Sequence, residues 1–510
     1  TRATSAPGSD AGRGLEKASH MKWKMVLPSP TSFALCCSLV AVFAAGKYEP
    51  NWDSLMTRPL PEWFDEAKIG IFLHWGVYSV PSFGNEWYWY FHDSLRDHNV
   101  VAFHNRTYGY RFKYPEFGPM FTAELFNPDE WAKIFKDAGA RYVVLTSKHH
   151  EGFTLWCSKE SFNWNACDIG PKRNLVEDLT KSVRRAGLRM GLYHSMFEWY
   201  HPLFQQDKAN NFNTRRYVDE VYYPQAIELN TLYKPDLIWS DGDGGGNSSY
   251  WRAPELLAWL YNDGAGTADK VVVNDRWGVD NPPIASGHHH GGYFNGDDQQ
   301  TANPDLLRHK WESAFTVDTG GAWGYARNRA LDNLLDARAL LHRVISAVAY
   351  GGNVLIDIGP THDGRIALIF QQRLRELGTW LRVNGEAIYS TVKWRAQNDT
   401  ASHGPRAGIY YTASKGDSPT VYAHMMAWPQ DGRLMLTQPQ PTNGTVVRML
   451  GCGVPMSFEK SASGSGMVVV IPPLAPPQLP SAEGPWVFSL KGVGWERSPP
   501  PESHPERIVV

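Results

Sequence analysis

The sequence predicts a (β/α)8-type barrel followed by a C-terminal antiparallel β-sandwich. Short apolar runs of strand length alternate with helical patterns between residues 69 and 383. Polar side chains directly follow most of these runs, as they do at the carboxyl ends of barrel strands. Beyond about residue 390, strand-like runs punctuated by Pro, Gly and Ser replace the helical patterns, which favours a separate β domain.

The predicted barrel strands are rich in β-branched and aromatic residues, and they are Ile69–Leu73, Tyr142–Thr146, Arg189–Tyr193, Leu237–Trp239, Val271–Val273 and Val354–Ile358. The predicted helices are Asn127–Ala138, Leu175–Ala186, Asp336–Tyr350 and Phe370–Val383. The first of them opens with a cap and a proline and stops at Gly139. A doubly wound sheet would carry a Gly-rich phosphate loop after its first strand, and none follows Leu73, so the barrel is favoured.

The predicted sandwich strands are Ile409–Thr412, Val421–Met425, Leu434–Leu436, Met467–Ile471 and Trp486–Leu490. We place the barrel domain at residues 46–388 and the sandwich at residues 389–494. The Pro-rich polar tail, residues 495–510, is expected to be disordered.

The first 45 residues are interpreted as a leader and secretory signal peptide. Lys22 and Lys24 precede an uncharged, mostly apolar run at 31–46, and Ala44 and Ala45 offer a cleavage site. No other stretch is long enough to span a membrane, so we expect an exported protein, either lysosomal or secreted. Export makes four N-x-S/T sequons plausible glycosylation sites: Asn105, Asn247, Asn398 and Asn443.

Composition excludes some classes of partner. The 50 Lys and Arg residues balance 52 Asp and Glu residues, which gives no electrostatic signature for nucleic acid or for an anionic membrane. The 21 Trp, 23 Tyr and 22 Phe residues supply a large core and can cover the apolar faces of sugar rings. No CxxC or HExxH spacing is present, and the triplet at 288–290 has no flanking acidic or Cys ligands, so no metal site is expected.

Polar side chains follow five successive predicted strands, as His74, His149 and His150, His194, Asp241, and Arg276 among others. In a barrel all strand carboxyl ends share one face, where active sites lie. Hydrolysis of a glycoside needs two carboxyl groups, and the candidates are Asp241, Asp298 and Glu312. The residues alone therefore predict an exported barrel hydrolase that acts on sugars.

Ten motifs carry a more specific resemblance. They are GIFLHWGVYSVP (70–81), NEWYWY (85–90), YVVLTSKHHEGFTLW (142–156), GLYHSMFEW (191–199), PDLIWSDGD (235–243), VVVNDRWG (271–278), HHGGYFN (289–295), HKWE (309–312), WGY (323–325) and GGNVLIDIGPTHDGRI (351–366). In this order they resemble the α-L-fucosidases of glycoside hydrolase family 29, of the animal tissue (lysosomal) type, from about residue 48 to 493.

The resemblance implies hydrolysis of α-linked L-fucose from glycoproteins and glycolipids with retention, through a fucosyl-enzyme intermediate on the nucleophile Asp241. It implies fucose-binding roles for His74, Glu86, Trp87, His149, His150, Tyr193, Arg276 and Trp323. It implies no metal and no cofactor, and we expect a homo-oligomer that acts on fucosylated glycans. The alternative is a catalytically inactive, lectin-like fucose-binding protein on the same fold, which the presence of Asp241 disfavours.

The acid/base residue stays open between two positions. Asp298 ends the run FNGDD in a Gly-containing loop, and we prefer it for that mobility. Glu312 has the longer reach, and Trp311 would raise its pKa by desolvation, whereas the neighbouring Lys310 and His309 would lower it. We expect both carboxyls on one loop or its return.

Three departures from the family pattern bear on the side of the leaving group: Asp243 stands where Glu is frequent, NGDD precedes the second carboxylate, and two glycines precede Trp323. Asp357 and Asp363 are interpreted as loop architecture. Cys157 and Cys167 lie in one stretch of an exported chain, so we predict a disulfide between them, worth roughly 2–3 kcal/mol in chain entropy.

Overall fold

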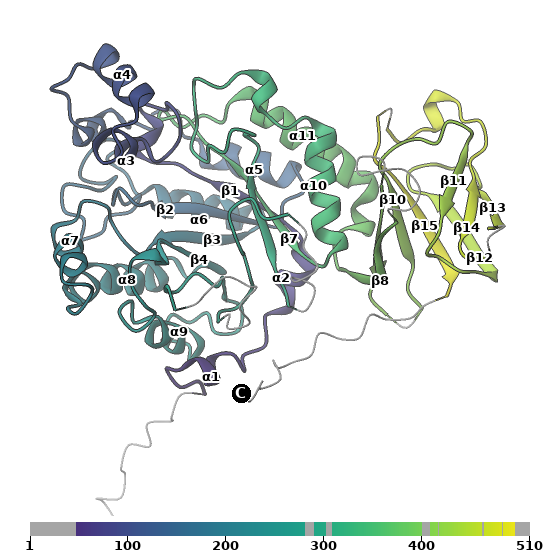
Figure 1. The fold of residues 1–510 in the computed structure, drawn as a ribbon, viewed down its shortest axis with the longest axis horizontal. Coiled ribbons are helices and arrows are strands. Elements are labelled where there is room, and N and C mark those ends of the chain that lie inside the picture. The colour runs from purple at the N-terminus through teal and green to yellow at the C-terminus, as the bar shows by residue number, and fades with distance from the viewer. Residues whose placement is uncertain are drawn as a thin grey trace, which may run out of the picture. The chain divides into compact units, whose positions relative to one another are not determined.

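Seven parallel strands form one curled sheet in the N-terminal region of the computed structural model (Figure 1). They are β1 (Ile69–Leu73), β2 (Tyr142–Lys148), β3 (Arg189–Ser195), β4 (Leu237–Asp241), β5 (Val272–Val273), β6 (Glu312–Thr316) and β7 (Asn353–Ile358). Their order is β5-β4-β3-β2-β1-β7-β6. The structure describes residues 47–280, 290–301, 309–399, 408–416, 418–461, 464–481 and 483–494, so the predicted leader and tail lie outside it.

A short extended segment joins the two edges of this sheet. The Tyr293 amide donates to the Val273 carbonyl of β5 at 3.0 Å. On the other side the Phe294 amide donates to the Lys310 carbonyl at 3.0 Å, and the Glu312 amide donates to the Phe294 carbonyl at 2.8 Å. Phe294 also forms an isolated parallel bridge with Trp311. This segment thus takes the place of the eighth strand, and the predicted barrel is confirmed.

Side chains alternate between the barrel interior and the surrounding helices, since successive strand residues point to opposite faces. Phe72 of β1 packs inward with Tyr142, Tyr193 and Trp239. Gly70 makes room for this layer, because a Cβ there would lie 2.3 Å from the Tyr142 ring.

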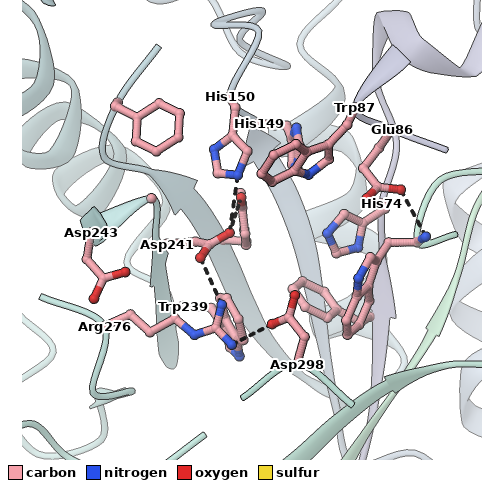
Figure 2. A pocket seen from close by; sticks show the side chains of 15 residues that line it. His74, Glu86, Trp87, His149, His150, Trp239, Asp241, Asp243, Arg276 and Asp298 are labelled. Carbon is pink, nitrogen blue, oxygen red and sulfur yellow. Dashed lines mark hydrogen bonds and ion pairs between the residues drawn. The ribbon is translucent and has the colours of Figure 1, made fainter. Parts of the chain in front are cut away.

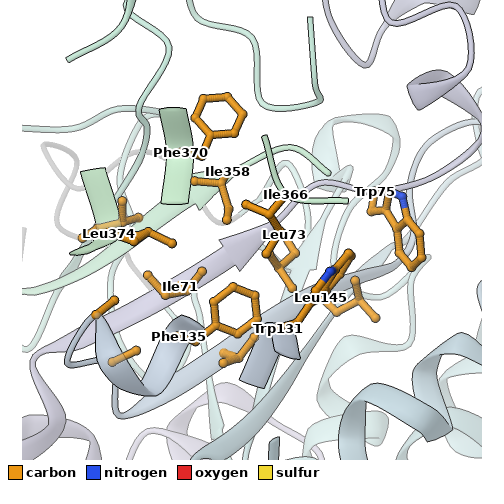
Figure 3. Packing of buried hydrophobic residues seen from close by; sticks show 14 of the residues in the cluster. Ile71, Leu73, Trp75, Trp131, Phe135, Leu145, Ile358, Ile366, Phe370 and Leu374 are labelled. Atoms are coloured by element: carbon orange, nitrogen blue, oxygen red, sulfur yellow. The ribbon is translucent and has the colours of Figure 1, made fainter. Parts of the chain in front are cut away.

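The outward side chains of β1 pack against the surrounding helices. Ile71 and Leu73 belong to the cluster that also holds Trp131 and Phe135 of α5 (Pro128–Asp137), and Phe370 of α11 (Leu368–Asn384) (Figure 3). The helices therefore cover the outer face of the sheet, and the strand ends are left to form a site.

The four predicted helices are confirmed to within two residues at each end. Besides α5 and α11 they are α6 (Leu175–Arg185) and α10 (Ala337–Ala349). Asn127, Asn174 and Asp336 cap three of them by accepting from backbone amides of the first turn. The other α-helices of the described residues are α1 (Trp52–Leu55), α2 (Glu62–Ala67), α3 (Tyr88–Asp93), α4 (His98–Thr107), α7 (Pro202–Ala209), α8 (Tyr223–Tyr233) and α9 (Ala253–Tyr261). None of the helices in these ranges is long and apolar enough to cross a bilayer.

The C-terminal region forms two antiparallel sheets, as predicted. One has the order β12-β15-β10-β9-β8 and the other β11-β14-β13. Their strands are β8 (Thr391–Asp399), β9 (Ile409–Ser414), β10 (Val421–Met425), β11 (Arg433–Leu436), β12 (Pro441–Met449), β13 (Ser457–Lys460), β14 (Met467–Val470) and β15 (Trp486–Val493). Helix α10 contacts β8 and β9, and the indole of Trp380 in α11 donates to the Pro485 carbonyl at 2.7 Å. The barrel helices α10 and α11 thus support the sandwich.

Candidate active site

A cavity of about 210 Å³ opens at the carboxyl ends of the barrel strands (Figure 2). Its lining comprises Phe72, His74, Glu86, Trp87, His149, His150, Tyr193, Phe197, Trp239, Asp241, Gly242, Asp243, Arg276, Asp298 and Trp323. Every substrate-binding and catalytic candidate from the sequence lines it, except Glu312. Strand-end positions far apart in the chain therefore meet in one place.

Asp241 is the last residue of β4 and the most strongly held carboxylate of the cavity. The Tyr193 hydroxyl donates to its Oδ2 at 2.8 Å, and Arg276 Nη1 donates to its Oδ1 at 2.9 Å. His150 Nε2 lies 3.6 Å from Oδ2. Burial acts to raise the pKa of Asp241, but the Arg276 charge and these hydrogen bonds more than offset it and hold that pKa below its usual range. Asp241 is therefore an ionised carboxylate that faces the cavity.

Arg276 joins Asp241 to Asp298. Its Nη1 binds the first carboxylate, and its Nη2 donates to Asp298 Oδ1 at 2.6 Å. The guanidinium carbon lies 4.6 Å from the centre of the Trp239 ring, so the floor of the cavity supports the cation. The Asp298 side chain is 56% exposed, compared with 18% for Asp241. The Arg276 guanidinium therefore holds two carboxylates in the same cavity, the mostly buried Asp241 and the mostly exposed Asp298.

Glu312 does not line the cavity. It is the first residue of β6 and is fully buried in the barrel, where it accepts from the Tyr142 hydroxyl at 2.6 Å and the Trp239 indole at 3.2 Å. The expectation that it shares a loop with Asp298 is wrong, because its backbone already pairs in the sheet. Burial raises its pKa.

The expected effect of Lys310 and His309 on Glu312 is also wrong. Lys310 Nζ donates to Asp65 at 2.8 Å, and the His309 ring stacks on Phe294 with centroids 3.9 Å apart. Neither side chain is among the partners of Glu312, whose hydrogen-bond donors are the Tyr142 hydroxyl, the Trp239 indole and the Asn295 side-chain amide.

His74 is positioned by Asp357 of β7, which the sequence analysis had assigned to loop architecture. The two are 2.7 Å apart at Nδ1 and Oδ1, and both side chains are buried. Burial lowers the pKa of His74 to about 3 and raises that of Asp357 well above its usual range. The Nδ1–Oδ1 hydrogen bond fixes the orientation of the neutral His74 ring and leaves its Nε2 for a ligand. The charged residue inside the apolar run 354–358 was the sequence signal for this role.

Glu86 fixes the wall that carries Trp323. Its Oε2 accepts from the backbone amides of Trp323 and Gly324 at 2.9 and 3.0 Å, across more than two hundred residues of chain. The Trp323 ring lies 5.2 Å from that of His74 between centroids. An aromatic plane therefore stands beside a hydrogen-bond donor, which suits a sugar with a polar and an apolar face.

The two histidines after β2 are held by different neighbours. His150 Nδ1 lies 2.7 Å from the Ser195 hydroxyl, and burial lowers the pKa of His150 well below its usual value. His149 Nδ1 lies 3.4 Å from Glu151 Oε2, which forms an ion pair with it if the imidazole is protonated. The Cys157–Cys167 disulfide, with its Cα atoms 5.2 Å apart, closes the loop that follows them.

Other polar residues near the strand ends turn away from the cavity. Lys148 donates to Glu198 at 3.0 Å and to Gln225 at 2.8 Å in the interior. Asp275 accepts from the Asn295 amide at 3.1 Å, and burial raises its pKa to about 7. Among the described residues, no group of three or more His, Cys, Asp and Glu side chains is placed to hold a metal ion. Two members of the 288–290 triplet lie outside those residues.

The cavity also contains residues that the sequence analysis did not assign to binding: Phe72, Phe197, Trp239, Gly242 and Asp243. Phe72 and Trp239 are inward-facing strand residues, so strand alternation was the signal available for them. Phe197 lies in the loop after β3, for which no periodic pattern exists.

Family models of known proteins match both the barrel domain and the C-terminal domain. The family model described as alpha-L-fucosidase matches residues 35–386, and the model described as alpha-L-fucosidase C-terminal domain matches residues 397–491. The chain belongs to the α-L-fucosidase family. It is a glycoside hydrolase, and the resemblance drawn from the ten motifs is confirmed.

The relatives of this fucosidase include both plasma and tissue enzymes of animals. An alpha-L-fucosidase of Branchiostoma floridae is 48% identical over 90% of this chain and 99% of its own. The rat plasma enzyme is 48% identical over 88% and 94% of the two chains, and the human tissue enzyme is 44% identical over 88% and 92%. A crystal structure of Thermotoga maritima alpha-fucosidase in complex with fucose is similar at a TM-score of 0.71 and 33% identity, covering 87% of this chain and 100% of that one.

Proposed function

We propose that the protein is a retaining exo-α-L-fucosidase that releases terminal α-linked L-fucose from glycoproteins and glycolipids. The observation that carries the proposal is the pair of carboxylates on one guanidinium. Asp241 is ionised and sheltered, and Asp298 is exposed on the other arm of Arg276. Retaining glycosidases need two carboxyls about 5–5.5 Å apart, one as nucleophile and one as acid/base.

In the first step Asp241 attacks the anomeric carbon from the β face, and the bond to the leaving oxygen breaks. Asp298 gives its proton to that oxygen as it departs. In the second step Asp298 takes a proton from water, which attacks the anomeric carbon and releases Asp241 together with α-L-fucose. Two inversions give net retention.

The remaining cavity residues bind the sugar in this proposal. Neutral His74 forms a hydrogen bond from Nε2 with a fucose hydroxyl, and Glu86, His149 and His150 offer further polar contacts. Trp323 and Trp87 cover the apolar side of the ring. Tyr193 keeps its proton, because burial raises its pKa well above the usual value, and its hydroxyl stabilises the Asp241 carboxylate.

Export, glycosylation and assembly belong to the same proposal. The signal at 1–45 and the plasma and tissue relatives support a secreted or lysosomal location. We also expect a homo-oligomer. Asn105, Asn247 and Asn443 are exposed and suit glycans. Asn398 is half-buried, and its amide donates to the Tyr350 hydroxyl at 2.8 Å, so we expect it to be unmodified.

Release of L-fucose from α1,2-, α1,3-, α1,4- and α1,6-linked oligosaccharides tests the function, with the anomer of the first product followed by NMR. We expect α-L-fucose at early times from at least one linkage. Fucose binding without release from any substrate would instead favour the inactive, lectin-like protein.

A further inference from the structure

The cavity has one closed and one open end. The closed end is lined by His74, Glu86 and His149, which are all at most 5% exposed. Phe197 and Asp243 line the other end and are partly exposed, and Trp87 and Trp323 are partly exposed as well. Asp241 lies between them, as Figure 2 shows for Asp243, Asp241 and His74.

The proposed exo-fucosidase reaction assigns the two ends, and the inference below rests on it. A terminal sugar has no further residue beyond it, so it fits the closed end. Its anomeric carbon then lies at Asp241, and the sugar that carries the fucose must extend through the open end. The residues of that end contact the leaving group.

Gly242 brings the chain to this position. Its φ is 75°, and a Cβ there would lie 2.8 Å from Phe197 Cδ1 and 3.1 Å from Ser195 Oγ. Only glycine therefore passes beneath Phe197 in this left-handed turn, which carries Asp243 to the rim. The loop is fixed farther on, because the Val279 amide and the Trp251 indole both donate to the Gly246 carbonyl, at 3.0 and 3.1 Å.

Phe197, which packs against Gly242, is also held in place by its neighbours. Its ring stacks on that of His150 with centroids 4.6 Å apart and planes 19° apart. The Ser195 hydroxyl, which lies 2.7 Å from His150, donates to the Phe197 carbonyl at 2.8 Å. An apolar ring and a carboxylate thus lie at the same end of the cavity, which is the combination that sugar rings require.

The Asp243 carboxylate is not used by an ion pair within the described part of the chain. Arg276, the cation of the cavity, donates to Asp241 and Asp298 instead. Burial first, and the charge of Asp241 second, raise the pKa of Asp243 to about 6. The carboxylate is partly exposed and lies beside a like charge, so it can accept a hydrogen bond from a ligand in addition to that from the Gly278 backbone.

We propose that Asp243 and Phe197 form the leaving-group subsite, in which Asp243 accepts a hydrogen bond from the sugar residue that carries the fucose. The donor is a hydroxyl or an acetamido N–H next to the scissile bond. Asp243 thereby sets the preference among linkages, and it takes no part in bond breaking.

The test compares Asp243→Asn and Asp243→Ala with wild type on two kinds of substrate. One is 4-nitrophenyl α-L-fucoside, whose leaving group carries no hydrogen-bond donor. The other is a set of fucosyl disaccharides, on galactose for hydroxyl donors and on N-acetylglucosamine for the acetamido group. Gly244→Ala is the matched control in the same loop, because a Cβ there meets nothing within 4 Å.

We expect both Asp243 variants to lose roughly 10- to 100-fold in kcat/KM on at least one class of disaccharide, which is the size of a hydrogen bond to a charged group. On the aryl fucoside their loss should be at least about tenfold smaller than on that disaccharide, whereas Gly244→Ala should stay within about twofold of wild type on every substrate. Equal losses on both kinds of substrate would overturn the proposal, since Asp243 would then act on the reaction centre. Unchanged values on all disaccharides would overturn it too. Wild-type turnover of the same substrates tests the proposed function separately.

Discussion

The two ends of the barrel each hold a carboxylate between hydrogen-bond donors, but the ligand-sized cavity described above lies at the carboxyl end of the strands. At the amino end of the sheet, Asp65 Oδ1 accepts from Lys68 at 2.9 Å and from Lys310 at 2.8 Å. Burial acts to raise the pKa of Asp65, but the two lysines hold it below its usual range, and burial lowers the pKa of Lys310 to about 7. Lys310 also donates to the Gly351 carbonyl at 3.1 Å, so the charged groups of this cluster find their hydrogen-bond partners within the protein.

At the carboxyl end Asp241 is held below its usual pKa in the same way, by Arg276 and Tyr193, but it borders a cavity of about 210 Å³. Arg276 divides its donors between two carboxylates, one of them mostly exposed. A buried carboxylate with a lowered pKa is thus present at both ends of the barrel, but of these two carboxylates only Asp241 lines the cavity. The predictions below separate the ends, starting with the largest effect.

Asp241→Asn should lower kcat/KM on 4-nitrophenyl α-L-fucoside by at least about 10⁴-fold, because the nucleophile is lost. Its melting temperature should change little. Asp65→Asn is the counterpart at the other end, and it should lower the melting temperature while keeping kcat/KM within about threefold, since it leaves two buried lysines without their shared carboxylate. Comparable loss of activity in both variants would mean that the two ends do not differ in function.

Asp298→Gly should lower turnover of disaccharides by about 10²- to 10⁴-fold, as expected for loss of an acid/base. Azide should restore turnover of the aryl fucoside and give α-L-fucosyl azide, because it replaces water on the fucosyl-enzyme. In Asp241→Gly azide attacks the substrate directly and should give the β anomer.

Glu312→Gln is the control for Asp298, as it keeps the shape of the buried side chain. We expect it to lower stability or turnover without azide rescue. Rescue to the α anomer in a Glu312 variant, and not in Asp298→Gly, would reverse the assignment of the acid/base.

Asp357→Ala should lower kcat/KM by roughly 10- to 100-fold, because His74 loses the partner that fixes its tautomer. Asp357→Asn should recover part of the loss, since its side-chain amide can also form a hydrogen bond with Nδ1. Kinetics on the aryl fucoside measure both, and nitrogen-15 NMR of His74 should show one fixed tautomer in wild type and a mixture in Asp357→Ala. An unchanged tautomer in Asp357→Ala would remove the positioning role.

The smallest effect is the pH dependence of leaving-group selection. The ratio of kcat/KM for a disaccharide to that for the aryl fucoside should fall several-fold as the pH drops through about 6, where Asp243 gains its proton and becomes a weaker acceptor. Asp241, Asp275 and Arg276 surround Asp243 electrostatically, but their titration affects both substrates and cancels in the ratio. The ratio should be flat in Asp243→Asn, and a slope that persists there would assign the effect to another group.

The comparison of the two ends also explains what the sequence could predict. Six barrel strands follow from apolar runs, but β6 reads ESAFT, in which polar and apolar residues are mixed, so it shows no apolar run. The segment that takes the place of the eighth strand forms one isolated bridge, between Phe294 and Trp311, and no continuous ladder. In the sandwich, β13 has no fully buried residue, and β8 has mostly half-buried ones, so neither produces a clear alternation.

The cavity residues were largely predictable, because parallel strands bring their carboxyl ends to one edge. The choice between Asp298 and Glu312 was not, since it depends on where β6 begins. If β6 began one residue later, Glu312 would belong to the preceding loop. Because β6 begins at Glu312, its side chain lies in the barrel interior. Asp357 was missed because its partner His74 is nearly three hundred residues away in the chain.

The central claim is that Asp241 is the nucleophile. A slow 2-deoxy-2-fluoro-α-L-fucosyl substrate with a good leaving group should trap the fucosyl-enzyme, and peptide mass spectrometry locates the label. The account predicts a single modified peptide with the sugar on Asp241. A label on Asp243, on Asp298 or on any other residue would contradict it.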